Sequence, residues 1–229
     1  LPADQLIKDK AAFQGCLSDA IEVATRTRAL VTIGIKPTWA CPGFGYIEHG
    51  KPVRLRKRPD NESIHRVERF REKPNPDLAD SFIRRGNFRW NAGMFVWSVS
   101  TMLREFNRHA PELADFLSPL RAPGNFETAL RERFTNLPRI SFDYAIMEKA
   151  DRVLVVEASF DWDDVGSWQA IARYFKKDAH GNAANSALTA LDSSDNIIFN
   201  EGKTTIALLG VRNLIVVRTG DAILLCHRH

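Results

Sequence analysis

The stretch KDKAAFQGCLSDAIEVATRTRALVTIGI, residues 8–35, joins a helical pattern of apolar residues to a run of β-branched ones. Apolar side chains recur at helical spacing over residues 12–24, which predicts a helix within Lys8–Thr25. The run Ala29–Ile35 is rich in branched residues and is followed by Pro37, which predicts a strand. A helix that leads into a strand is the repeating unit of an α/β sheet, so this stretch predicts the α/β class.

The alternation of helices and strands continues along the chain. Further strands are predicted over residues 63–74, 93–99 and 152–158, and further helices after Ser100, Ser141 and Ser167. Asn75 followed by Pro76 is typical of a helix start, and that helix should end at Gly86. Residues 41–50, CPGFGYIEHG, contain three glycines and are interpreted as a loop.

The character of the chain changes near residue 180. Beyond it, short strand-like runs such as NIIF and NLIVVR alternate with turns, and no helical period is found. Turn signals recur about every ten residues, which indicates stacked hairpins or solenoid-like rungs. We therefore predict two domains, residues 1–180 and residues 181–229.

Composition limits the classes of partner. The 229 residues carry 32 basic and 28 acidic side chains, a net charge of +4. This mild excess suits an anionic small molecule and gives no indication of a nucleic-acid partner. The basic run within Arg54–Arg58 lacks interleaved aromatic residues and is interpreted as a solvated loop.

The location and the ends of the chain follow from other features. Three widely separated cysteines argue against a disulfide framework and indicate the cytoplasm. No run approaches the roughly 18 apolar residues of a membrane span. The first residues, LPADQLIKDK, lack an initiator Met and a signal-peptide pattern, so we expect a chain cut from a larger protein.

Two acidic sites are candidates for a metal. Asp4 lies in LPADQ at the expected end of a strand, and Asp161, Asp163 and Asp164 follow the strand 152–158. Ligands of open α/β sheets bind beyond the carboxyl ends of strands, and Mg²⁺ prefers a few carboxylates together with phosphate and water. The alternative is an acidic turn in which the aspartates cap helices or face solvent.

A second group of residues suits a sugar phosphate. Glu72 and Asn91 can make paired hydrogen bonds with sugar hydroxyls, and Lys73 can meet a phosphate as a point charge. The glycines of PGFGY would allow backbone amides to approach a ligand. The alternative is an exposed Glu72–Lys73 ion pair, with Asn91 in a turn and the glycines in an ordinary loop.

The motifs LPAD, GFGYIE, FREKP, WNAGMFVW, SFDYAIMEK and FDWDDVGSW occur in this order. With them the chain resembles bacterial mannose-1-phosphate guanylyltransferases nearly from end to end. The resemblance implies a Rossmann-like nucleotidyltransferase domain lacking its first strands, followed by a small β module of left-handed β-helix type. It also implies Mg²⁺-dependent attack of mannose 1-phosphate on GTP, which yields GDP-mannose and pyrophosphate.

The resemblance also assigns roles to residues. Asp4 and Asp164 would hold the metal and, with Lys73, act in catalysis. Seven residues would contact or shape the substrate site: Gly45, Tyr46, Glu72, Lys73, Asn91, Gly93 and Asp143. The phosphoryl chemistry fits this set, because such a transfer needs positioning and charge neutralisation rather than a side-chain nucleophile.

Two departures from the family pattern matter. The family usually has His after LPAD, where this chain has Gln5, which cannot titrate near neutral pH. The family's glycine-rich loop for the triphosphate, of the form Gly-Gly-x-Gly-Thr-Arg, has no match here. We therefore expect an open, apolar sheet edge that pairs with another segment or chain, and a homodimer is one hypothesis.

Three functions remain open from the sequence. The leading one is GDP-mannose synthesis for a surface polysaccharide. The nearest alternative is another sugar-1-phosphate nucleotidyltransferase, using glucose 1-phosphate with UTP or dTTP. The third is a non-catalytic fragment that binds sugar phosphate, which the missing glycine-rich loop favours.

Overall fold

The computed structural model describes residues 1–54, 63–118 and 126–229 of the chain. Arg56, Lys57 and Arg58 of the basic run lie outside these residues. The described residues form two compact units: unit 1 comprises Leu1–Ala3 and Ile7–Trp162, and unit 2 comprises Asp4–Leu6 and Asp163–His229.

The first helix and strand form as the sequence predicts. Helix α1, Lys10–Thr27, begins where the Asp9 carboxylate accepts a hydrogen bond from the Ala12 N–H at 2.9 Å, which satisfies one free amide of the first turn. Its buried face includes Cys16, Ala20 and Val23. The next strand, β1, has every residue buried, as its apolar composition predicts.

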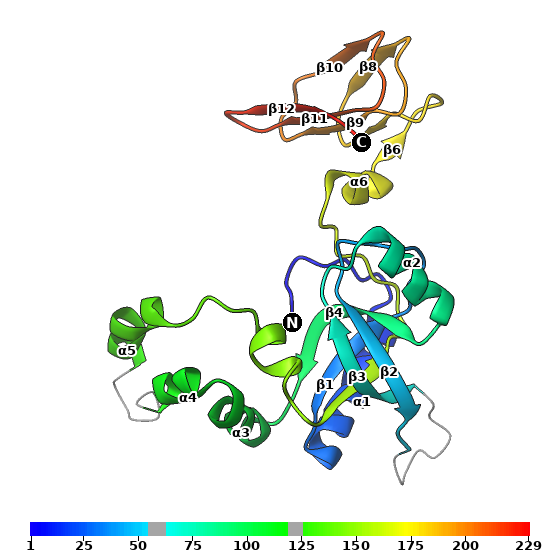
Figure 1. The fold of residues 1–229 in the computed structure, drawn as a ribbon. Coiled ribbons are helices and arrows are strands. Elements are labelled where there is room, and N and C mark those ends of the chain that lie inside the picture. Colours follow the sequence, from blue (N-terminus) through cyan, green and yellow to red (C-terminus); the bar gives the residue numbers. More distant parts are fainter. Residues whose placement is uncertain (55–62, 119–125) are drawn as a thin grey trace. The chain divides into compact units, whose positions relative to one another are not determined.

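Five strands make the framework of unit 1 (Figure 1). They are β1 (Leu30–Ile35), β2 (Tyr46–Pro52), β3 (Ile64–Arg71), β4 (Phe88–Val96) and β5 (Val153–Glu157). The order is β1-β4-β2-β3-β5, and β5 pairs in parallel with β1 and antiparallel with β3, which closes the sheet into a ring. The α/β class is confirmed, but the open apolar edge expected for this domain is wrong for the described strands, because β5 pairs on both sides.

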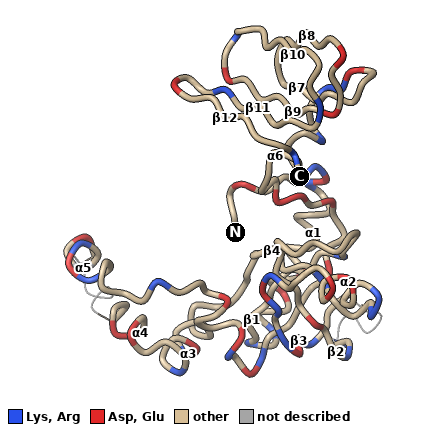
Figure 2. Tube along the Cα trace, turned by 45° about the horizontal axis from the view of Figure 1, so that its top comes forward, with Lys and Arg blue, Asp and Glu red and all other residues tan. Residues whose placement is uncertain are grey.

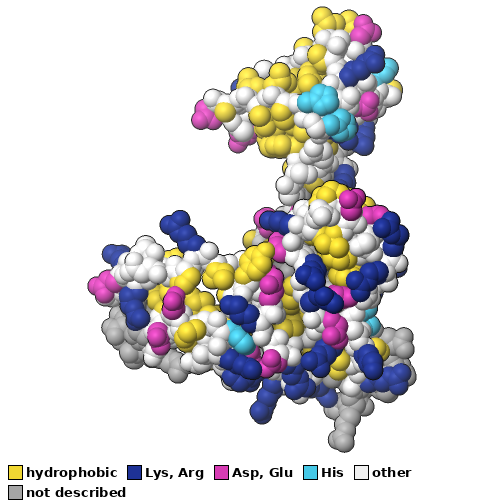
Figure 3. Space-filling model, in the orientation of Figure 1, with side chains coloured by type: hydrophobic (Ala, Val, Ile, Leu, Met, Phe, Trp, Pro, Cys, Tyr) yellow, Lys and Arg dark blue, Asp and Glu magenta, His cyan; other side chains and the backbone are white. Residues whose placement is uncertain are grey.

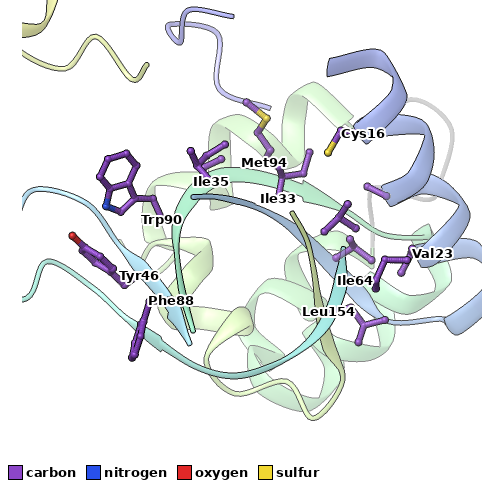
Figure 4. Close-up of a cluster of buried hydrophobic side chains, with 14 of the residues drawn as sticks. Cys16, Val23, Ile33, Ile35, Tyr46, Ile64, Phe88, Trp90, Met94 and Leu154 are labelled. Atoms are coloured by element: carbon purple, nitrogen blue, oxygen red, sulfur yellow. The ribbon is translucent and has the colours of Figure 1, made fainter. Parts of the chain in front are cut away.

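The two faces of these strands pack against different partners. Figure 4 shows Ile64 of β3 and Leu154 of β5 beside Val23 of α1, in a cluster that also contains Ile33 of β1. The residues of opposite parity face away from α1; Leu30, for example, packs in a second apolar cluster with Met102 and Ile146. This period of two separates an apolar face from one that includes polar side chains.

The segment 46–52 is a strand, so its interpretation as part of a loop is wrong. Tyr46 and Ile47 are fully buried, and β2 pairs antiparallel with both β3 and β4. Gly50 and Pro52 hid this strand in the sequence, and the pairing with β3 is indeed irregular on either side of His49.

Capping residues set where the helices of unit 1 begin and end. Helix α2, Pro76–Arg85, has Asn75 as its N-cap and ends at Gly86 with φ +75°, both as predicted. The next helix, α3, starts two residues earlier than predicted because Ser98, not Ser100, provides the N-cap. The remaining helices are α3 (Val99–His109), α4 (Pro111–Leu117), α5 (Phe126–Arg133), a 3₁₀ turn (Phe134–Asn136) and a π-helix (Asp143–Met147).

Charged side chains alternate along β3 and α2 in Figure 2, where blue and red stretches are interspersed. One buried carboxylate organises part of this surface: Glu48 pairs with Arg69 Nε at 2.6 Å and also with Arg85. Paired in this way, the buried charge avoids the desolvation penalty of an isolated ion.

Unit 2 is built from short parallel rungs. Its elements are α6 (Trp168–Ile171), a 3₁₀ turn (Ala172–Tyr174), β6 (Lys176–Lys177), β7 (Ala183–Ala184), β8 (Leu188–Leu191), β9 (Ile197–Asn200), β10 (Ile206–Leu209), β11 (Leu214–Arg218) and β12 (Ile223–His227). Strands β7, β9 and β11 pair in parallel, as do β8 and β10. This pattern confirms the solenoid-like rungs predicted from the turn spacing.

Buried asparagines connect the rungs of unit 2. The Asn196 side chain donates to Asn182 Oδ1 at 2.8 Å and accepts from the Leu214 N–H at 2.9 Å. Trp168 and Ala172 pack into the apolar core of the same unit, with Ile197. The main segment of unit 2 is therefore Asp163–His229, while the domain boundary predicted at residue 180 stays a prediction.

Among the described strands, one exposed apolar edge lies in unit 2. Strand β12 is at one end of the five-stranded sheet, and Ile223, Leu224 and Leu225 are exposed on it. Figure 3 shows hydrophobic side chains gathered over β11 and β12. Among the described residues, no helix is long and apolar enough to cross a membrane.

The contact between α1 and β1 should dominate the stability of unit 1. Replacing the fully buried Ile33 (Ile33→Ala) removes three buried carbons, so we expect the free energy of unfolding to fall by about 2–5 kcal/mol. Ile21→Ala on the exposed side of α1 is the matched control and should change it by about 0.5 kcal/mol or less. Urea unfolding followed by circular dichroism measures both, and equal effects would contradict this packing.

Candidate active site

Asn91 lies at the centre of the polar residues of unit 1. Its side-chain amide donates to Asp143 Oδ1 at 2.8 Å, and its Oδ1 accepts from the Thr32 hydroxyl at 3.3 Å and the Gly93 N–H at 3.1 Å. The backbone N–H of Asn91 donates to the Gly45 carbonyl at 2.8 Å. Bonds from three elements therefore fix the orientation of this side chain.

Two glycines make room around Asn91. A Cβ at Gly45 would lie 2.5 Å from Glu72 Oε2 and 3.5 Å from Asn91 Cβ, so any larger residue would collide with the carboxylate. Gly93 has φ +67°, a left-handed conformation that glycine adopts without steric cost. The structure thus brings Gly45, Glu72, Asn91 and Gly93 together, as the resemblance implied.

Two glutamates close to Asp143, Glu72 and Glu148, have raised pKa values. Burial, and then the charge of Asp143, raise the pKa of Glu72, whereas Lys73 opposes the shift. Burial and Asp143 also raise the pKa of Glu148. Asp143 begins the π-helix, a rare element that is frequent at functional sites. The result is a concentrated group of hydrogen-bonding oxygens suited to hydroxyl groups.

Lys73 follows directly after Glu72, beyond the end of β3. Its backbone has φ +43°, which is uncommon for a residue other than glycine. The side chain is 69% exposed, and its Nζ is 3.9 Å from Glu72 Oε1. This cation is therefore accessible beside the carboxylates, where a phosphate would need a positive charge.

Tyr46 is placed differently from the other residues of this group. Its side chain is fully buried, and its hydroxyl accepts from the Cys41 N–H and donates to the Cys41 carbonyl, both at 3.0 Å. A substrate-contacting role for this side chain, expected from the resemblance, does not fit these contacts. Tyr46 instead anchors the loop that carries Gly45.

Of the three aspartates that follow β5, two have structural partners. The Asp161 carboxylate in unit 1 accepts from the Asp9 N–H at 2.8 Å and the Lys8 N–H at 3.1 Å, and these bonds lower its pKa. In unit 2, Asp163 accepts from Arg173 at 3.0 Å and from the Tyr174 hydroxyl at 2.9 Å. Both carboxylates therefore have a structural role, because they bond to neighbouring segments of the chain.

Asp164 is the aspartate whose environment suits a cation. Burial raises its pKa, the amide of Gly166 opposes the shift, and the neighbouring Asp163 adds to it. A dication would offset both unfavourable contributions. An antiparallel bridge between Leu6 and Asp163 lays the segment of Asp4 beside that of Asp164, although no strand ends at Asp4 in the described part of the chain.

The residues of the candidate site thus belong to two groups. Gly45, Glu72, Lys73, Asn91 and Asp143 lie in unit 1, whereas Asp4 and Asp164 lie in unit 2. Two contributors, Thr32 and Glu148, were not predicted from the sequence. Thr32 had a signal, since it is the one hydroxyl in the otherwise apolar run LVTIGI, and Glu148 lies near the end of the motif SFDYAIMEK.

Comparison with known families gives a clear result. Residues 1–181 match the family model of nucleotidyl transferases. The chain belongs to the nucleotidyl transferase family. Residues 187–229 match a second model, the MannoseP isomerase/GMP-like beta-helix domain, in agreement with the parallel rungs of unit 2.

Relatives of the nucleotidyl transferase include proteins of bacterial polysaccharide synthesis. The xanthan biosynthesis protein XanB of Xanthomonas campestris is 35% identical over 232 residues, covering 100% of this chain and 47% of the relative. A mannose-1-phosphate guanylyltransferase of Sinorhizobium fredii is 32% identical, with 97% and 43% covered. The chain thus spans about half the length of these relatives.

A solved structure supports the fold. A crystal structure from Thermus thermophilus, described as a mannose-1-phosphate geranyltransferase, superposes with a TM-score of 0.83 at 35% identity. The match covers 100% of this chain and 64% of the other. The resemblance read from the motifs is confirmed by these relatives.

The carboxylate group offers a test by pH titration. Because burial and Asp143 raise the pKa of Glu72, this carboxyl should ionise at a higher pH than an ordinary glutamate. Asp143→Asn removes a negative charge and should lower that pKa, whereas Lys73→Met removes the opposing cation and should raise it further. Carbon-detected NMR of the Glu72 carboxyl measures both, and shifts of the same sign in the two variants would contradict the arrangement.

Proposed function

We propose that the chain is the nucleotidyltransferase part of a mannose-1-phosphate guanylyltransferase, which transfers GMP from GTP to mannose 1-phosphate. The proposal rests on the site of unit 1 and on the named relatives, of which the chain spans about half. The observation that carries it is the group around Asn91, where the side-chain amide bonds the Asp143 carboxylate and Gly45 leaves room for the Glu72 carboxylate.

The unit 1 group suits the sugar end of the substrate. Glu72 and Asn91 present oxygens and an amide that can bond paired hydroxyls, and Asp143 fixes which end of the Asn91 amide is the donor. Asp143 is therefore assigned to orienting Asn91 rather than to the chemical step. Such fixed donors and acceptors bind one arrangement of hydroxyls better than another, which provides selectivity among sugars.

Charge neutralisation is assigned to Lys73 and to the aspartates of unit 2. Lys73 would pair with the phosphate of the sugar, and Asp4 with Asp164 would hold Mg²⁺, whose preference is for oxygen ligands. When bound, the metal would neutralise phosphate charge and polarise the phosphorus under attack. Asp164 is assigned this role rather than the neighbouring Asp163, because the Asp163 carboxylate already accepts hydrogen bonds from Arg173 and Tyr174.

The reaction needs no covalent intermediate with the protein. A phosphate oxygen of mannose 1-phosphate attacks the α-phosphorus of GTP, the bond from that phosphorus to the bridging oxygen breaks, and pyrophosphate leaves with the bonding electrons. The contribution of the side chains is to bind, to orient and to balance charge. We place the reaction in the cytoplasm, in keeping with Cys16, Cys41 and Cys226, which form no disulfide in the described structure, and a homodimer stays a prediction.

Sugar-phosphate binding tests the unit 1 site. Asn91→Ala removes the donor to Asp143 and the acceptor of Thr32, so we expect the dissociation constant of mannose 1-phosphate to rise about 10- to 100-fold. Asn107→Ala on the exposed side of α3 is the matched control and should leave it unchanged. Calorimetry measures both, and tighter binding of glucose 1-phosphate than of mannose 1-phosphate would contradict the sugar assignment.

Pyrophosphate release tests the metal aspartates. With mannose 1-phosphate, GTP and Mg²⁺ present, Asp164→Asn should slow release by about a hundredfold or more, because a metal ligand is lost. Asp192→Asn is a matched control in unit 2: Asp192 is exposed and has φ +51°, a conformation that asparagine tolerates. Equal rates in the native chain and Asp164→Asn would overturn the assignment of Asp164.

A further inference from the structure

Closure of the ring in unit 1 brings together two histidines and a glutamate that the proposed function does not use. His49 lies on β2, His65 on β3 and Glu157 at the end of β5. One ligand atom from each lies within 4.8 Å of the other two, and His65 Nε2 is 3.0 Å from Glu157 Oε1. All three side chains are largely but not completely buried, with 11%, 12% and 27% exposed.

The hydrogen bonds of the two imidazoles define which nitrogen faces the glutamate. Both Nδ1 atoms contact the Gly50 carbonyl, at 3.4 Å for His49 and 3.3 Å for His65. A carbonyl oxygen only accepts, so each Nδ1 is placed to donate to it, which leaves Nε2 as the ring atom that can bind a metal. Ligating histidines are typically held in this way, with the other ring nitrogen donating to a carbonyl.

The two Nε2 atoms are paired differently. His65 Nε2 lies at hydrogen-bond distance from Glu157 Oε1, whereas His49 Nε2 is 3.9 Å from the same oxygen, is buried, and has no hydrogen-bond partner among the described residues. A buried polar atom without a partner is unfavourable. A cation bound where the three side chains converge would give His49 Nε2 that partner.

The charged neighbour of this cluster is Arg89 of β4. Its Nη2 donates to Glu157 Oε1 at 2.6 Å, while its Nε is buried without a hydrogen-bond partner in the described part of the chain. Burial, and then Arg89 and His65, lower the pKa of His49. On β1 the neighbour is Gly34, where a Cβ would lie 2.8 Å from Arg89 Cβ.

We propose that His49, His65 and Glu157 bind a first-row transition-metal dication, with Zn²⁺ the best match. Imidazole nitrogen suits Zn²⁺, whereas Mg²⁺ prefers oxygen ligands, so this site differs in kind from the one proposed at Asp4 and Asp164. Zn–N and Zn–O bonds of about 2.1 Å put tetrahedral ligands about 3.4 Å apart, so the three side chains need to close by an ångström or so. Arg89 would then be an outer partner that orients the carboxylate.

A metal bound at this site would link three strands of the ring. It joins β2, β3 and β5, and β3–β5 is the pairing that closes the ring. A metal that binds only the folded chain raises the free energy of unfolding. The increase grows with the logarithm of the metal concentration divided by the dissociation constant. We therefore expect the melting temperature of the protein to rise with the Zn²⁺ concentration. This measurement needs no substrate, so a negative result would not bear on the proposed function.

Zinc binding to the whole chain is the direct experiment. The Cys226→Ser form should serve as the reference, because Cys226 is exposed and a thiolate could bind Zn²⁺ by itself. Calorimetry in excess Mg²⁺ should show one equivalent of Zn²⁺, and His49→Gln and His65→Gln should each weaken it by more than about a hundredfold, beyond the loss usual for an outer partner. His180→Gln, an exposed histidine of unit 2, is the matched control and should bind like the reference.

Melting curves and a spectroscopic probe complete the test. Zn²⁺ should raise the melting temperature of the reference and of His180→Gln but not that of the two ligand variants. Co²⁺ on the intact ligand set should give visible absorption of a nitrogen- and oxygen-bound ion, which needs no substitution at the site. Absence of Zn²⁺ binding, binding in His49→Gln and His65→Gln that is as tight as in the reference, or a colourless Co²⁺ mixture would each overturn the proposal.

Discussion

The pairing of β5 with both β1 and β3 is the constraint on which unit 1 depends. It converts a row of strands into a ring, so that strands distant in sequence share one face. Because side chains alternate along each strand, the ring presents apolar residues such as Ile33 toward α1 and turns residues such as Asn91 and Glu157 away from it. One face of these strands therefore forms the apolar core, and the opposite face carries the polar residues of the candidate site.

Asn91 shows how closely stability and binding are linked in this arrangement. Its backbone N–H holds the Gly45 loop, while its side chain joins β1 through Thr32 and the π-helix through Asp143. Substitution of the Asn91 side chain would therefore remove bonds to β1 and to the π-helix together while keeping the backbone bond to Gly45. The buried amides of Asn182 and Asn196 serve unit 2 in the same way, by satisfying backbone groups between rungs.

Local patterns predicted the elements whose signals are local. The periods of α1 and β1 and the caps Asn75 and Gly86 were all confirmed. The strand β2 was missed because its evidence is not local: YIEHGKP contains a glycine and a proline, and only pairing with β3 and β4 makes it a strand. The same limit applies to FDWDD, since the contact that distinguishes Asp161 from Asp164 is with Asp9, far away in the sequence.

Charge explains why the carboxylates of unit 1 need the residues around them. Burial, and then repulsion from Asp143, raise the pKa values of Glu72 and Glu148. Hydroxyl groups stabilise such a cluster because they donate hydrogen bonds to it, whereas a phosphate would add to its negative charge unless a cation intervenes. The exposed Lys73 beside Glu72 supplies that cation, so the sugar should bind against the carboxylates with its phosphate directed toward Lys73.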